Sequence, residues 1–135
     1  HLHIGLRIAM TTVCQIHFVL RPNSSGVWSV QDDADHEPFG VDKVTGVIQG
    51  SDFIRVYFNP VYQKAGVVQI TTDDDFAGSI SAHASLGTQA VHIRLKAAPH
   101  LLATDPWINP AQIWNYVPNN GGGNLWVSVS MVDPL

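Results

Sequence analysis

A chain of 135 residues, of which 45% are hydrophobic and 13% charged, is long and apolar enough to form a folded domain, which excludes intrinsic disorder. The net charge of -4 and the scattered positions of the seven Lys and Arg residues exclude the basic surface typical of nucleic-acid binding. No apolar run approaches the roughly 20 residues that cross a bilayer, so membrane insertion is not expected either.

The chain begins with a short segment, residues 1–9, that precedes Met10 and contains a His-x-His pair. We expect it to be a vector-derived or linker segment, and we predict that residues 10–135 form a single domain. Cys14 is the only cysteine, which rules out an internal disulfide. Its apolar neighbours indicate a small buried side chain.

Alternating apolar and polar residues, with the period of half-buried β-strands, occur in four segments: 14–20, 54–58, 91–95 and 127–131. Shorter strands bounded by turn residues are predicted at 27–30, 44–49, 67–72 and 80–84. The alternation predicts the following buried positions: Cys14, Ile16, Phe18, Trp28, Val56, Phe58, Val91, Ile93, Val127 and Val129.

About eight short strands without a long amphipathic helix are typical of a sandwich of two sheets. We therefore predict an all-β domain, an antiparallel β-sandwich of jelly-roll type. Helical turns are expected only near residues 110–116.

The long segment 97–124 interrupts this regular spacing and is rich in Pro and Asn. A connection of this length in a compact domain is usually functional or poorly ordered. Aromatic rings beside amides suit the recognition of sugars or protein surfaces. The predicted ligand-binding residues are Trp107, Trp114, Asn115, Tyr116, Asn119 and Asn120. The alternative is that the rings close one end of the core.

No catalytic constellation is found. The chain has no Gly-x-Ser-x-Gly motif, and its single glutamate, Glu37, leaves only turn-like aspartate clusters as carboxylates for acid–base chemistry. Cys14 and His17 lie three residues apart on a strand and therefore on opposite faces. The sequence predicts neither an enzyme nor a bound cofactor.

Metal binding remains open at three places. The acidic clusters 32–37 and 73–75 supply oxygen ligands but are expected to be solvated loops, and Pro38 stands where an EF-hand loop needs glycine. A hairpin centred near Gly87 and Thr88 would place His83 opposite His92, either as a metal or pH-sensing pair or as an ordinary surface pair. We favour the ordinary interpretation in each case.

One resemblance depends on several short motifs distributed over most of residues 13–96. They are VWSVQDD at 27–33, His36, Pro38, Gly40, Val41, Val44, IRVYF at 54–58 and SLG at 85–87. This pattern resembles the C-terminal domains of tail-fibre and minor tail proteins from phages of actinobacteria. The sequence after Lys96 departs from the pattern.

The resemblance implies a β-rich, homotrimeric virion component at the tail tip, where a non-catalytic domain binds a glycan or envelope polymer of the host surface. It supplies no catalytic residues. Two alternatives stay open: a carbohydrate-binding or lectin-like module of a secreted bacterial protein, and a structural decoration or fibre-cap domain of a virion. The expected location is thus the virion tail tip or the extracellular space.

Overall fold

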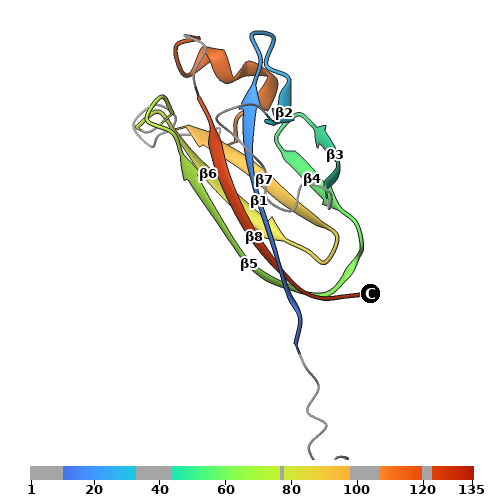
Figure 1. Cartoon of the computed structure of the whole chain (residues 1–135). Helices are drawn as coiled ribbons and strands as arrows, with labels where there is room; N and C mark the ends of the chain where they lie inside the picture. The colour runs from blue at the N-terminus through green and yellow to red at the C-terminus, as the bar shows by residue number, and fades with distance from the viewer. Residues whose placement is uncertain (1–10, 33–43, 77, 98–106, 120–122) are drawn as a thin grey trace, which may run out of the picture.

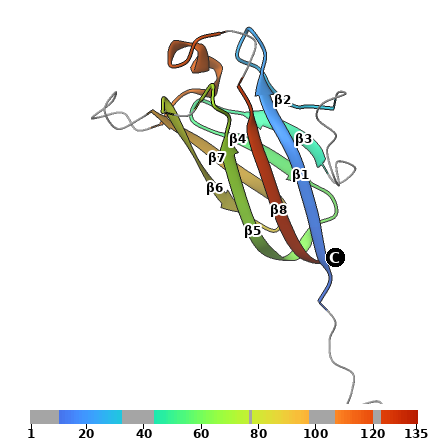
Figure 2. The ribbon, with the colours of Figure 1, turned by 60° about the vertical axis from the view of Figure 1, so that its left-hand side comes forward.

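The computed structural model describes residues 11–32, 44–76, 78–97, 107–119 and 123–135. Two antiparallel four-stranded sheets lie face to face (Figures 1 and 2). Of the described residues, 60% lie in strands and 6% in helix. The predicted all-β antiparallel sandwich is therefore confirmed.

The first sheet has the strand order β2-β1-β8-β5, and the second sheet has the order β3-β4-β7-β6. The strands of the first sheet are β1 (Val13–Pro22), β2 (Trp28–Val30), β5 (Tyr62–Thr72) and β8 (Leu125–Pro134). Those of the second are β3 (Val44–Gln49), β4 (Ile54–Phe58), β6 (Ile80–Leu86) and β7 (Ala90–Ala97). A short 3-10 helix, η3 (Pro110–Asn115), lies at the end of the sandwich opposite the C-terminus (Figure 1).

The core fills the space between the sheets because each strand turns alternate side chains inward. β4 and β7 alternate strictly between buried and partly exposed positions. The predicted buried residues Ile16, Phe18, Trp28, Val56, Phe58, Val91, Ile93, Val127 and Val129 are all buried. Cys14 is only partly buried, because it lies near the start of β1, at the edge of the core. Its sulfur accepts a hydrogen bond from the hydroxyl of buried Tyr62 at 3.3 Å.

Trp28 connects the first sheet to η3. Its indole Nε1 donates to the carbonyl oxygen of Pro110 at 2.9 Å, and its ring lies 6.0 Å from that of Phe76. Gly26 is required beside it, because its φ is +79° and a Cβ there would lie 2.2 Å from the carbonyl oxygen of Ala111. The helical turns predicted near 110–116 are confirmed, and the side chain of Asn109 caps them by accepting from the N–H of Ala111.

The predicted pairing of His83 with His92 is wrong. His83 lies opposite Arg94, and His92 lies opposite Ser85. The N–H of Gly87 donates to the carbonyl of Ala90, which centres the hairpin one residue later than expected. A shift of one residue in the centre moves the pairing by two, so both histidines keep the same face without facing each other.

A cationic and aromatic face as the candidate functional site

The outer face of the second sheet gathers cationic and aromatic side chains. Arg55 of β4 lies opposite His92 of β7, and Arg94 and Lys96 follow His92 at every second position. Because the alternate residues of β4 and β7 are buried, these side chains all point away from the core. We call the set Arg55, Tyr57, His83, His92, Arg94, Lys96 and Trp107 the cationic face.

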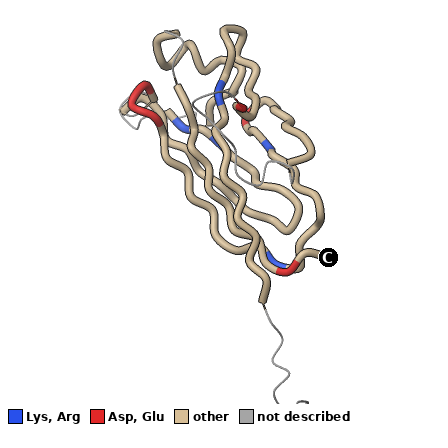
Figure 3. The backbone as a smooth tube through the Cα atoms, viewed as in Figure 1, with Lys and Arg blue, Asp and Glu red and all other residues tan. Residues whose placement is uncertain are grey.

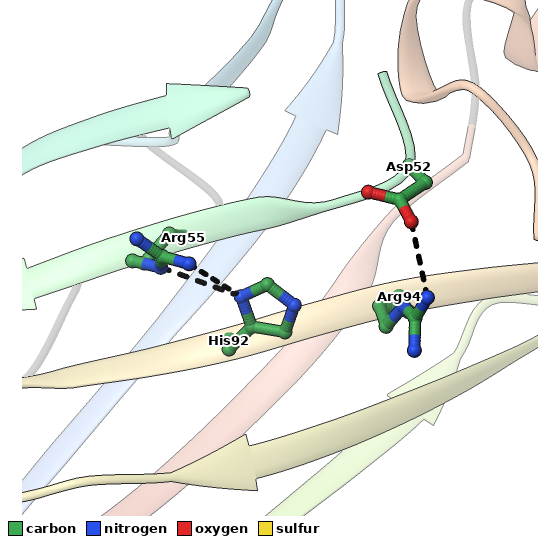
Figure 4. A network of polar contacts seen from close by, with 4 residues as sticks. All are labelled: Asp52, Arg55, His92 and Arg94. Carbon is green, nitrogen blue, oxygen red and sulfur yellow. Dashed lines mark hydrogen bonds and ion pairs between the residues drawn. The ribbon is translucent and has the colours of Figure 1, made fainter. Parts of the chain in front are cut away.

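Arg55 is held by several neighbours (Figure 4). Its Nη2 and Nε donate to Nδ1 of His92 at 3.1 and 3.3 Å, and its Nη1 donates to the hydroxyl of Tyr57 at 3.1 Å. The guanidinium carbon also lies 4.8 Å from the centre of the Phe53 ring, which stacks on His92 at 5.0 Å. These contacts fix the guanidinium in one orientation.

The hydrogen bonds from Arg55 define the protonation of His92. Since a guanidinium can only donate, Nδ1 of His92 accepts, and the neutral ring carries its proton on Nε2. Burial lowers the pKa of His92 from its ordinary value of 6.5, and the positive charges of Arg55 and Arg94 lower it further, against a smaller opposing effect of Asp52. The unfolded chain then binds the proton more strongly, so the free energy of unfolding falls as the pH drops below 6.5.

Arg94 forms the second fixed guanidinium. Its Nη2 donates to Oδ2 of Asp52 at 3.0 Å, in an ion pair whose side chains are 36% and 44% exposed. Its guanidinium carbon lies 4.1 Å from the centre of the Trp107 ring. Nε of Arg94 is buried without a hydrogen-bond partner among the described residues. Arg94 is therefore oriented by a carboxylate and an aromatic ring while more than a third of its surface meets solvent.

Trp107 is anchored on β7 beside this guanidinium. It forms an isolated bridge with Lys96, and the next residue, Ile108, is fully buried and donates its N–H to Leu95. The ammonium of Lys96 lies 5.7 Å from the centre of the indole ring, and His83 meets the ring edge-on at 5.6 Å. The indole ring therefore lies beside the guanidinium of Arg94, the ammonium of Lys96 and the imidazole of His83.

The balance of charge on this face is opposite to that of the whole chain. Arg55, Arg94 and Lys96 are three of its seven Lys and Arg residues, and among the described contacts only Asp52 opposes them. Guanidinium groups donate in pairs to carboxylate or phosphate oxygens. The chemistry of these oriented guanidinium groups therefore suits an anionic group bound at this face.

No protein-family model, curated protein or solved structure matches this chain. The candidate site is therefore supported by the geometry of its residues alone. No helix in the described ranges is long and apolar enough to cross a membrane. The same ranges contain no group of three or more His, Cys, Asp or Glu side chains that could hold a metal ion.

The structure describes one of the two acidic clusters, residues 73–75, and only the first residue of the other, 32–37. Residues 33–37 lie outside the described residues, so the first cluster is not tested beyond Asp32. In the second cluster, Asp73 accepts from the side-chain amide of Asn124 at 2.9 Å and from the N–H of Asp74 at 3.1 Å. Asn124 in turn accepts from Nε of Arg21 at 2.8 Å. Asp73 therefore belongs to a network that fixes one end of the first sheet.

The predicted ligand-binding residues lie in different surroundings in the structure. Trp107 belongs to the cationic face, whereas Trp114 is partly buried against the core and donates its Nε1 hydrogen to the carbonyl of Asn23 at 2.7 Å. Tyr116 also packs against the core. Asn115 and Asn119 are exposed, and Asn120 lies outside the described residues.

We expect different effects from replacing these rings. Trp107→Ala should weaken ligand binding and lower the melting temperature only slightly, because Ile108 still anchors the segment. Trp114→Ala should lower the free energy of unfolding by roughly 1 to 3 kcal/mol, less than for a fully buried ring, because half-buried apolar contacts and one hydrogen bond are lost. Thermal and urea unfolding, with binding measured on the same samples, would test both. A strong loss of stability in Trp107→Ala would place that ring in the core instead.

We expect His92 to make anion binding pH-dependent. A bound anion favours the charged imidazolium and raises the pKa of His92, so binding takes up a proton and affinity should rise as the pH falls from neutral toward the lowered pKa of His92 in the free protein. Titrations of an anionic ligand across this range would measure the slope. His92→Gln should flatten this slope while its amide oxygen still accepts from Arg55. An unchanged slope in His92→Gln would contradict the assignment.

Proposed function

We propose that this protein is a non-catalytic attachment domain that binds an anionic polymer of a cell surface through its cationic face. The observation that carries the proposal is the pair of oriented, partly exposed guanidinium groups of Arg55 and Arg94 beside the indole of Trp107. Fixed donors lose little conformational entropy on binding, which favours an oxyanion at this position.

The extended form of the face favours a polymer over a small molecule. The side chains of His92, Arg94 and Lys96 follow one strand, and four residues of strand cover about 13 Å. A row of this kind offers repeated contacts to a chain with one charge per unit, and the aromatic ring gives a surface for the apolar side of a sugar. Carboxylate and phosphate groups both fit the guanidinium geometry.

The resemblance to phage tail-fibre domains supports a place at a virion tail tip, and we propose a homotrimer there. Light scattering on the purified domain at micromolar concentration should give three times the chain mass. A monomeric domain would contradict the proposed location at a virion tail tip. It would favour a carbohydrate-binding module of a secreted bacterial protein, which could bind an anionic polymer through the same cationic face.

Titration calorimetry with three polymers tests the binding proposal. Polygalacturonate presents carboxylates, a polyglycerol phosphate teichoic acid presents phosphates, and dextran presents neither. We expect binding to at least one anionic polymer that weakens at higher salt, and we expect any binding of dextran to be independent of salt. Binding of neither anionic polymer would overturn the proposal.

A further inference from the structure

The outer face of the first sheet differs in chemistry from the cationic face. The middle of its β1, β8 and β5 rows carries polar side chains other than Lys, Arg, Asp and Glu, with Ser128 between His17 and Gln69. Figure 3 shows the middle of these strands without acidic or basic residues, which lie toward the strand ends. The same strands stand in front in Figure 1, so this face points away from the second sheet.

A groove runs along this face, and its shape depends on a β-bulge. Gln15, Val67, Gln69, Ser128 and Ser130 line it. The pairing of β5 with β8 shifts between Ala65 and Val68, and the N–H of Val67 donates to the hydroxyl of Ser130 at 2.9 Å instead of continuing the ladder.

Glycine is needed at the bulge, since a Cβ on Gly66 would lie 2.4 Å from the carbonyl oxygen of Ser130. The groove is therefore built into the backbone of β5 and β8. It does not depend on the conformation of one exposed side chain.

Trp126 stands beside the groove. It pairs with Val19 and Thr71, lies two residues before Ser128 on the same face of β8, and is 42% exposed. Its neighbours along the groove offer carboxamide and hydroxyl groups, each of which can both donate and accept hydrogen bonds. A pyranose ring has the complementary surface, with C–H groups on its faces and hydroxyls around its rim.

We propose that this groove is a second binding site, for an uncharged pyranose chain, in which Trp126 stacks on a sugar ring and Gln15, Gln69 and Ser128 bond its hydroxyls. The residues that line the groove carry no formal charge, and Lys64 lies one row further along, opposite Val132, which favours a neutral sugar over an acidic one. The site does not rest on the proposed function, because it lies on the opposite sheet and uses different residues.

A second copy of the chain is the competing occupant, since Val13 and Val67 are exposed on the same face. The groove lining argues against it. A protein partner would bury two carboxamides and two hydroxyls, and each would need a matching group from the partner. Sugar hydroxyls supply such groups at every unit of the chain.

NMR titrations with maltohexaose, cellohexaose, mannohexaose and xylohexaose test the proposal. At least one should shift the side-chain amide signals of Gln15 and Gln69 and the indole signal of Trp126. Trp126→Ala and Gln69→Ala should each weaken that binding at least tenfold, and Trp107→Ala on the other sheet should leave it unchanged. Binding to anionic polymers should survive Trp126→Ala, so the two proposals fail separately.

Three results would overturn this inference. The first is no saturable shift of these signals with any of the four oligosaccharides. The second is binding that both Trp126→Ala and Gln69→Ala leave unchanged. The third is a change in oligomeric state in Trp126→Ala, seen by light scattering, which would assign the face to contact between copies. Should Trp126→Ala fail to fold, Gln69→Ala and Trp126→Phe carry the test, since an exposed polar side chain and a retained ring leave the sheet intact.

Discussion

Trp28→Ala should lower the free energy of unfolding by about 3 to 5 kcal/mol, the range for loss of a large buried aromatic side chain. Trp28 is 3% exposed, and it belongs to the shortest strand of the first sheet. Its ring packs near Phe76, and its Nε1 hydrogen is bound by the carbonyl of Pro110. Truncation therefore opens a cavity and leaves a buried carbonyl without its donor at the same time.

Urea unfolding followed by circular dichroism measures this loss. Trp28→Phe keeps one six-membered ring but loses the hydrogen bond and part of the buried volume, so it should cost less, about 1 to 3 kcal/mol. Trp126→Ala is the matched control, because the same substitution at a 42% exposed position should cost clearly less than at Trp28. Equal losses at the two positions would show that Trp28 does not anchor η3 to the sheet.

The architecture was predictable because one face of each of the strands β1, β4, β7 and β8 is buried. The period of two in 54–58 and 91–95 assigned Val56, Phe58, Val91 and Ile93 to the core, and the structure confirms all four. The same pattern placed Arg55 and Arg94 on the outward side. The alternation of apolar and polar residues within one strand therefore predicts which side chains are buried, even when the neighbouring strand is unknown.

The pairing of one strand with another cannot be predicted from the local pattern. Arg55 and His92 meet because β4 pairs with β7, although β5 and β6 lie between them in the chain and β5 belongs to the other sheet. No local pattern gives this pairing. The hairpin register was also beyond local reasoning, since the choice between two adjacent turn centres decides whether His83 faces His92 or Arg94.

The segment 97–124 shows how composition alone misleads. Its aromatic rings were grouped into one predicted binding surface, yet the described part sends Trp107 to the outer face of β7 and Trp114 toward the carbonyl of Asn23. The alternative, that the rings close one end of the core, fits Trp114 and Tyr116, which pack against the core. Ligand binding stays a prediction for Trp107. Trp107 and Trp114 are close in sequence, but the fold places them in different surroundings.

Removing the two fixed guanidinium groups should have the largest effect on ligand binding. A hydrogen bond to a charged group contributes about 1.5 to 3 kcal/mol, and the lower figure applies at partly exposed positions such as Arg94. Since about 1.4 kcal/mol changes affinity tenfold, Arg55→Gln and Arg94→Gln should each weaken binding of an anionic polymer by about tenfold. The double variant should lose roughly a hundredfold if the two arginines act independently.

Matched variants separate this local effect from a general change of charge. Lys64→Gln removes one positive charge from β5, on the first sheet, and should change affinity less than twofold at physiological salt. Asp52→Asn should act in the opposite direction, because it removes the negative charge beside Arg94 while the Asn side-chain oxygen can still accept from the guanidinium, and so raises affinity. Calorimetric titration of all variants with the polymer that binds the unaltered domain gives the comparison. Equal losses in Lys64→Gln and Arg55→Gln would mean that net charge governs binding, and the cationic face would then not be the site.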